Sequence, residues 1–293
     1  MSSSIELLRQ VRALGPNWNP AVLAATNAIF ENAVQTSAPG VDRIADLPFG
    51  DHMRQRLDAY VPDGRSLATL LFVPGGGFTA GGKDEHPSFY RNVGVYFAKK
   101  GFLTFIANYR LAPECCWAEQ THDVASAVRW VGENVKRYGG VEEGLSVIGH
   151  SAGAVNLAGF LSHPRYEGQA VASGVRKAIL ISGVYRFAEQ SPKNVQLYAG
   201  EREAWPDRSP INHIGRCRVP LVLCAAELDP EELASSTIEF AMANARVNGH
   251  YAPMYVLPGH NHVSTVRSIG SPAQAVGELL SSFTLTAESE AHQ

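Results

Sequence analysis

Residues Leu145-Ser-Val-Ile-Gly-His-Ser-Ala-Gly153 decide the fold of this 293-residue chain. The apolar residues at 145–148 predict a buried strand, and the Ala- and Leu-rich stretch 151–162 predicts a helix directly after it. Gly-x-Ser-x-Gly between a strand and a helix is typical of a sharp turn that holds a serine hydroxyl beyond the sheet. Any side chain at Gly149 or Gly153 would clash in so tight a turn. The pattern predicts Ser151 as a nucleophile, with an ordinary glycine-rich turn as the alternative.

Strand and helix patterns alternate along most of the chain. Residues 57–61 alternate apolar and polar side chains, as a half-buried strand would. Apolar runs predict further strands at 67–73, 102–107, 178–181, 221–225 and 254–257, and helical periodicity marks 86–100, 118–138 and 232–247. We therefore expect the α/β class, with a mostly parallel central sheet and helices on both faces.

A triple glycine follows the predicted strand 67–73, in Pro74-Gly-Gly-Gly-Phe78. Glycines leave backbone N–H groups uncovered, and such groups stabilise a carbonyl oxygen that becomes an oxyanion. We expect Gly76 and Gly77 to supply one set of donors and the N–H of Ala152, after the nucleophile, to supply another. The alternative is a flexible glycine loop.

A serine hydroxyl needs a base, and the base needs an acid that orients it. In a strand-turn-helix site of this kind the acid precedes the histidine in the chain. The stretch after the last predicted strand holds two histidines, and we favour His262 over His260 as the base. The preceding strand ends at Glu227 and Asp229, of which Asp229 is favoured and Glu227 is the alternative. His150 is expected to point away from the active face.

Together these motifs resemble the carboxylesterase and hormone-sensitive-lipase-like branch of the α/β-hydrolases, over about residues 41–283. Tyr109-Arg-Leu-Ala-Pro-Glu114 combined with Gly-His-Ser-Ala-Gly is specific to that broad group. The resemblance implies an α/β-hydrolase fold and hydrolysis of a small to medium carboxylic ester, without metal or organic cofactor. Arylformamidases are also similar, so an amidase acting on an N-acyl aromatic compound is one alternative. A non-catalytic, hydrolase-like binding protein is the other.

Two segments depart from that family pattern. Pro74 stands where the familiar His-Gly-Gly-Gly loop has its histidine, so the geometry of the loop is expected to differ. Cys115-Cys116-Trp117 replaces the usual polar and proline-rich stretch after Ala-Pro-Glu. We expect all four cysteines to be free, since no Cys-x-x-Cys pair is present.

Three regions are expected along the chain. Helical periodicity at 5–14 and 22–34 makes residues 1–40 a helical lid or arm, with plain packing against the core as the alternative. Residues 41–286 form the catalytic domain, with a small cap at about 183–215, and 287–293 form a tail. Phe78, His260 and parts of the first and cap regions are expected to contact substrate. Four aromatic residues of the cap suit either a pocket or internal packing: Tyr185, Phe187, Tyr198 and Trp205.

Composition narrows the classes of partner. The formal net charge is −3 and no basic run occurs, which argues against nucleic acid and anionic membranes. The first ten residues do not resemble a secretory signal, and no apolar stretch approaches the roughly 20 residues of a membrane span. We therefore expect a cytoplasmic protein that binds a small-molecule ester or amide, with a homodimer left open.

Overall fold

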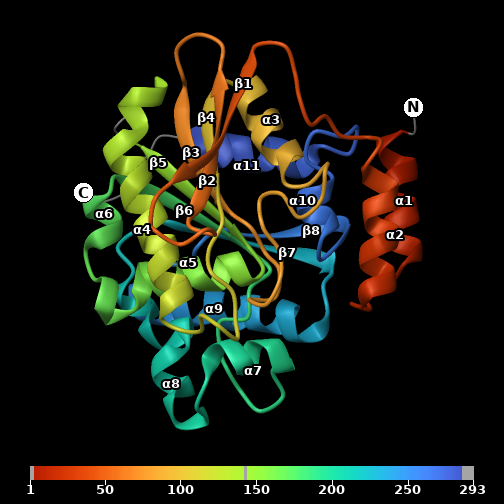
Figure 1. Cartoon of the computed structure of the whole chain (residues 1–293). Helices are drawn as coiled ribbons and strands as arrows, with labels where there is room; N and C mark the ends of the chain where they lie inside the picture. The colour runs from red at the N-terminus through yellow and green to blue at the C-terminus, as the bar shows by residue number, and fades with distance from the viewer. Residues whose placement is uncertain (1–2, 142–143, 286–293) are drawn as a thin grey trace.

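A computed structural model describes residues 3–141 and 144–285 (Figure 1). Its centre is an eight-stranded sheet in the order β1-β2-β4-β3-β5-β6-β7-β8. The strands are β1 (Val41–Pro48), β2 (Arg56–Pro62), β3 (Ala68–Val73), β4 (Phe102–Ala107), β5 (Leu145–His150), β6 (Val175–Ile181), β7 (Leu221–Leu228) and β8 (Met254–Asn261). β2 pairs antiparallel with β1 and β4, and every neighbouring pair from β4 to β8 is parallel. The predicted mostly parallel sheet is confirmed.

Helices cover both faces of the sheet, as predicted (Figure 1). One face packs against α3 (Arg91–Lys99), α10 (Ser264–Arg267) and α11 (Ala275–Leu285), and the other against α4 (Glu119–Asn134), α5 (Ala152–Ser162) and α9 (Glu231–Asn248). In β3, Leu70 and Phe72 belong to the first of these cores, whereas Leu71 and Val73 belong to the second. Burial on both faces explains why the central strands are continuously apolar in sequence.

The first two strands differ from their sequence expectations. β1 was not predicted, because its exposed edge position imposes no apolar alternation and a bulge interrupts its pairing between Ile44 and Leu47. The half-buried pattern expected for β2 is wrong, since Asp58 and Tyr60 are as fully buried as their apolar neighbours. Asp58 is tolerated there because it forms ion pairs with the buried Lys83 and with the more accessible Arg43.

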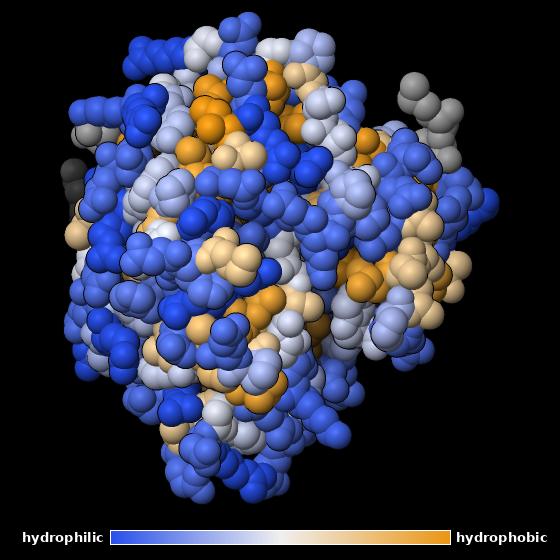
Figure 2. Space-filling model, in the orientation of Figure 1, coloured by the Kyte–Doolittle hydropathy of each residue, from blue (hydrophilic) through white to orange (hydrophobic). Residues whose placement is uncertain are grey.

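The N-terminal helices α1 (Ser4–Ala13) and α2 (Pro20–Phe30) lie beside β8 and α10, at the sheet edge opposite β1 (Figure 1). Ser3 caps the N-terminus of α1, and Asn19 caps that of α2. The Asn261 side-chain amide donates a hydrogen bond to Thr26 Oγ1 at 2.9 Å. Figure 2 shows apolar side chains beside these helices, with further apolar groups at the top and in the lower middle of a largely hydrophilic face. The described helices are too short or too polar to cross a bilayer.

Residues between β6 and β7 form a separate group of short helices below the sheet in Figure 1. They include α7 (Lys193–Ala199) and α8 (Trp205–Arg208), followed by a 3-10 helix at Pro210–Arg216. Their aromatic side chains pack inward, and Tyr198 stacks on Phe78 with ring centroids 4.0 Å apart. The tail predicted for residues 287–293 lies outside the described residues.

Candidate active site

Ser151 occupies the sharp turn between β5 and α5. Its backbone has φ 54° and ψ −123°, a region that a residue with a side chain rarely adopts. A Cβ at Gly149 would lie 2.7 Å from the Cα of Ala154, and one at Gly153 would lie 2.2 Å from the carbonyl oxygen of Val73. Both positions therefore need glycine for the reason expected from the sequence.

Three side chains from separate loops meet at this turn. His262, after β8, accepts a hydrogen bond at Nε2 from the Ser151 hydroxyl at 2.9 Å. Its Nδ1 donates to Asp229 Oδ1, also at 2.9 Å, from the loop after β7. Asp229 and His262 are buried, which shields the pair from water. The carboxylate thus fixes the tautomer in which Nε2 is free to take the serine proton.

Two further groups hold the Asp229 carboxylate. Its Oδ2 accepts hydrogen bonds from Ser182 Oγ at 2.6 Å and from the backbone N–H of Ala226 at 2.8 Å. Ser182 directly follows β6, which lies between β5 and β7, and its φ is 53°. Sequence reasoning missed this serine, although a polar residue at the carboxyl end of a central parallel strand is a usable signal.

The two alternative site residues lie elsewhere. Glu227 accepts a hydrogen bond from Arg12 Nη2 at 2.7 Å and another from the N–H of Gly259, so it ties α1 to β8. His260 is buried and hydrogen-bonded to Ser264 Oγ, and burial lowers its pKa to about 4. His260 does not line the cavity beside Ser151, in contrast to its expected contact with substrate.

The sequence predicted that His150 points away from the active face, but in the structure its side chain lies against His262. Its Nε2 donates to the main-chain oxygen of His262 at 2.9 Å, and the two imidazole rings lie 4.9 Å apart. Complete burial, with a contribution from His262, lowers the pKa of His150 well below its ordinary value. A neutral imidazole therefore supports the backbone that carries His262.

The glycine loop is ordered by contacts that take the place of the family histidine. The Pro74 carbonyl accepts from the Tyr109 hydroxyl at 3.1 Å, and the Gly75 N–H donates to the Tyr90 hydroxyl at the same distance. The Asn194 amide donates to the Gly77 carbonyl at 2.9 Å. Together with the bond from the N–H of Ala80 to the Gly76 carbonyl, these bonds fix the loop.

The amides expected to bind an oxyanion are available. The N–H groups of Gly76, Gly77 and Ala152 form no hydrogen bond with any described residue. Gly76 and Gly77 line the cavity next to Ser151, and Ala152 begins α5. Unsatisfied amides at a helix N-terminus favour negative charge in front of them.

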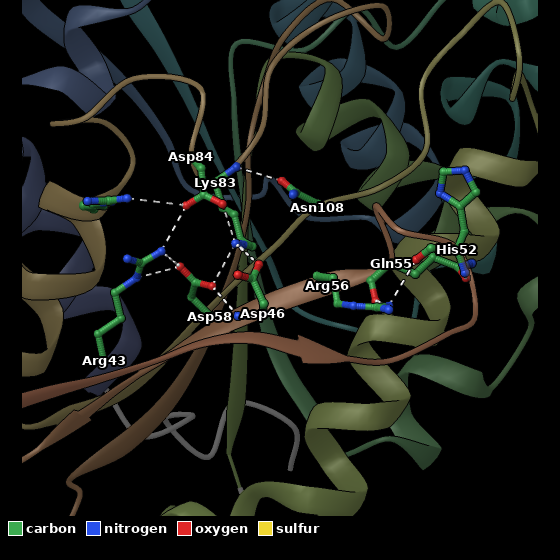
Figure 3. Close-up of polar contacts among 10 residues, drawn as sticks. Arg43, Asp46, His52, Gln55, Arg56, Asp58, Lys83, Asp84 and Asn108 are labelled. Carbon is green, nitrogen blue, oxygen red and sulfur yellow. Dashed lines mark hydrogen bonds and ion pairs between the residues drawn. The ribbon is translucent and has the colours of Figure 1, made fainter.

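A charge network with Lys83 and Asp58 buried at its centre includes residues that follow this loop in the chain (Figure 3). Lys83, with its side chain 1% exposed, contacts Asp46 at 2.7 Å, Asp58 at 2.9 Å and also Asp84. Arg43 Nε donates to Asp58 at 2.8 Å. Burial alone would lower the pKa of Lys83, but its hydrogen bonds to the three carboxylates raise it. Lys83 is therefore held in its charged form.

This network connects to the glycine loop through the segment after it. The N–H of Lys83 donates to Asn108 Oδ1 at 2.7 Å, and Arg54 Nη2 donates to the Gly81 carbonyl at 2.7 Å (Figure 3 shows the first of these). Gly81 packs so closely on Gly76 that a Cβ on Gly76 would lie 2.7 Å from the Cα of Gly81. The position of the open amides thus depends on the segment that the network fixes.

Ser151 and His262 face a cavity of about 970 Å³. Segments far apart in the sequence line it: 16–23 of the N-terminal segment, the glycine loop with Phe78, Glu85 and Tyr90 after that loop, the turn at 150–155, and residues of 184–195, 230–233 and 262–267. Trp18 lies with its ring centroid 5.4 Å from that of His262. The four cap aromatics predicted for either a pocket or packing are not among the lining residues. Cys115 and Cys116, which are free thiols, are not among them either.

One group of described residues has the composition of metal ligands, namely His163, Asp207 and His213. This group lies apart from the cavity. Within it, His163 Nε2 is 3.6 Å from Asp207 Oδ2. His213 Nε2 is already bonded to the Asp207 carbonyl at 2.6 Å, and His163 Nδ1 accepts from the N–H of Arg165. None of these three residues lines the cavity beside Ser151.

Comparison with known proteins agrees with this architecture. The BD-FAE family model matches residues 57–232. Esterase LipQ of Mycobacterium tuberculosis is 27% identical over 92% of this chain and 72% of its own length. Esterase LipC of the same organism is also 27% identical, over 73% of this chain and 58% of its own length.

Solved structures show the same fold at low sequence identity. Esterase B of Lactobacillus rhamnosis superposes with a TM-score of 0.71 at 17% identity, covering 96% of this chain and 95% of its own. A hyperthermophilic esterase of the archaeon Pyrobaculum calidifontis gives 0.70 at 19% identity, over 97% and 98% of the two chains.

Proposed function

The chain belongs to the BD-FAE family, among the carboxylesterases of the α/β-hydrolase fold, and from that premise we propose that it hydrolyses small to medium carboxylic esters through an acyl-enzyme. The observation that carries the proposal is the continuous hydrogen-bond relay from Ser151 through His262 to Asp229. The adjoining cavity, of about 970 Å³, has the volume of a small-molecule site.

In the first half of the reaction, Ser151 Oγ attacks the ester carbonyl carbon while His262 Nε2 takes the hydroxyl proton. Asp229 stabilises the imidazolium that forms but keeps its own charge. The negative oxygen of the tetrahedral intermediate accepts hydrogen bonds from the amides of Gly76, Gly77 and Ala152. The intermediate collapses when the C–O bond to the alcohol breaks, and His262 gives the proton to the departing oxygen.

The second half repeats these steps with water. His262 removes a proton from a water molecule that attacks the acyl-Ser151 carbonyl. The same amides stabilise the second oxyanion, and the carboxylic acid leaves as Ser151 recovers its proton. No other reactant is required.

Replacing Ser151 by alanine tests the nucleophile directly. Ser151→Ala is expected to lower kcat for p-nitrophenyl acetate by at least about 10⁴-fold, because the covalent step is lost. Ser282→Ala, on the outer helix α11, is the matched control and should keep full activity. Circular dichroism verifies the fold of both variants. Turnover by Ser151→Ala near that of the control would refute the proposal.

Two measurements separate this function from its alternatives. A fluorophosphonate probe should label the wild type and not Ser151→Ala, whereas a non-catalytic binding protein would remain unlabelled. Rates on aryl esters and on N-formyl aryl amines of matched size should favour the esters. Faster cleavage of the formyl amines would replace the esterase proposal by an amidase.

A further inference from the structure

Arg267 is a buried cation for which the described part of the chain provides no ion pair, although the charge of Glu85 acts on it from a greater distance. It lies in α10, five residues after His262, and is 6% exposed. Its Nε donates to the neutral side chain of Asn27 at 3.1 Å, while its buried Nη1 has no hydrogen-bond partner. Within residues 3–141 and 144–285, no carboxylate lies within ion-pair distance of this guanidinium. Buried charges in proteins are normally paired, so this arrangement needs a reason.

Aromatic rings offset only part of the free-energy cost of removing the Arg267 guanidinium from water. The guanidinium carbon lies 4.3 Å from the ring centroid of Phe89 and 4.8 Å from that of Tyr90. Such cation–π contacts stabilise the charge, but a ring face accepts no strong hydrogen bond from Nη1. The hydrogen-bonding capacity of Arg267 therefore remains incompletely used.

Arg267 is placed where a substrate can use it. It is the sole arginine or lysine among the described residues that line the cavity beside Ser151. Tyr90, on which it packs, is bonded to the glycine loop through Gly75, so Arg267 lies on the oxyanion side of the cavity. The acidic lining residues Glu85, Glu231 and Glu232 are exposed to solvent, which screens their charge.

We propose that Arg267 is a specificity-determining residue, which binds a carboxylate carried by the ester substrate. This inference rests on the proposed esterase function and narrows its substrates to hemiesters of dicarboxylic acids, or esters whose alcohol carries a carboxylate. A carboxylate matches the planar guanidinium with paired N–H···O bonds. It would supply the acceptor that the buried nitrogen lacks. The ester carbonyl would meanwhile lie at Ser151.

Paired substrates of equal size test the proposal on the wild-type protein. For the acyl side, mono-p-nitrophenyl glutarate is compared with p-nitrophenyl 5-methylhexanoate, in which an isopropyl group takes the place of the carboxylate. For the alcohol side, 4-acetoxybenzoate is compared with 4-acetoxybenzamide. In at least one pair, kcat/KM should favour the carboxylate by about 10- to 100-fold, through a lower KM. Equal rates within both pairs would overturn the proposal, while turnover of the neutral esters would leave the esterase function standing.

Variants separate substrate recognition from a structural role. Arg267→Met should bring the charged-to-neutral ratio of kcat/KM close to one, and Arg267→Lys should restore part of it. Arg218→Met, at an exposed position, is the matched control and should keep the wild-type ratio. A ratio unchanged in Arg267→Met would refute the assignment even if overall activity fell.

Inhibition of the wild type provides a readout that needs no variant to fold. Glutarate should inhibit hydrolysis of p-nitrophenyl acetate competitively, at least about 10-fold more strongly than glutaramide. Equal inhibition by the two would count against Arg267 as a carboxylate site. If the wild type hydrolysed none of the esters, the esterase function itself would fail.

Discussion

Replacing Lys83 by methionine tests the charge network that has Lys83 and Asp58 buried at its centre. Methionine keeps most of the side-chain volume but leaves Asp58, whose side chain is fully buried, with only Arg43 as its cationic partner. Asp46 and Asp84 also lose their contacts with the ammonium. Removing one member of a buried ionic group costs about 3–5 kcal/mol, because an uncompensated charge stays behind.

Urea denaturation, followed by circular dichroism, measures this loss. With a slope of about 3 kcal/mol per molar urea, the midpoint of unfolding should fall by about 1–1.7 M. Exposed Lys193 provides the matched control, and Lys193→Met should change the free energy of unfolding by less than about 0.5 kcal/mol. A loss below about 1 kcal/mol for Lys83→Met would refute the reasoning.

A double variant tests whether charge is the cause. Adding Asp58→Asn to Lys83→Met removes the buried anion that the first change left uncompensated. The double variant should therefore be at least about 1 kcal/mol more stable than the sum of the two single losses predicts. Strictly additive losses would show that the two side chains contribute independently, and the network would not act as an ionic unit.

Two further predictions concern the acids and the histidines near the site. Asp229→Asn should lower kcat for p-nitrophenyl acetate by about 10⁴-fold, because the asparagine no longer holds His262 in the tautomer that accepts the serine proton. Glu227→Gln should lower kcat far less. Equal losses in the two variants would contradict the assignment of Asp229 as the triad acid. Burial lowers the pKa of His260 from 6.5 to about 4, so between these pH values the unfolded chain binds a proton that the folded protein does not. The contribution of neutral His260 to the free energy of unfolding is therefore complete above pH 6.5 and is lost as the pH falls toward 4. Between pH 7 and pH 5 the wild type should lose about 2 kcal/mol more unfolding free energy than His260→Gln, measured in urea, and parallel pH profiles would contradict this.

The architecture could be predicted from the sequence wherever burial imposes a pattern. β4 begins and ends at the predicted residues, and the predicted nucleophile helix differs from α5 by one residue. β1 could not be predicted, because its exposed side chains leave no periodicity to detect. Asp58 was interpreted as a solvent-facing residue of β2, since its ionic partners come from segments distant in sequence.

The candidate site shows the same division between local and long-range information. The glycines around Ser151 are dictated by the turn itself, so the sequence pattern suffices. The choice between Asp229 and Glu227 depends on where two loops meet in space, so the sequence favoured Asp229 without excluding Glu227. Ser182 and Arg267 were not predicted, because their significance depends on contacts made across the folded chain, to Asp229 and Asn27 respectively.

The contacts of α2 with residues near the C-terminal end of the described chain also affect the order in which the protein folds during synthesis. Asn27 and Thr26 find their partners in Arg267 and Asn261, 240 and 235 residues later. At typical synthesis rates those partners leave the ribosome about 12–50 s after α2 does. During that interval the apolar faces of α1 and α2 can pack against each other and Phe89, but they lack the partners that β8 and α10 provide. The wall that Trp18 contributes beside His262 is therefore completed late, although α1 and α2 are translated well before β8 and α10.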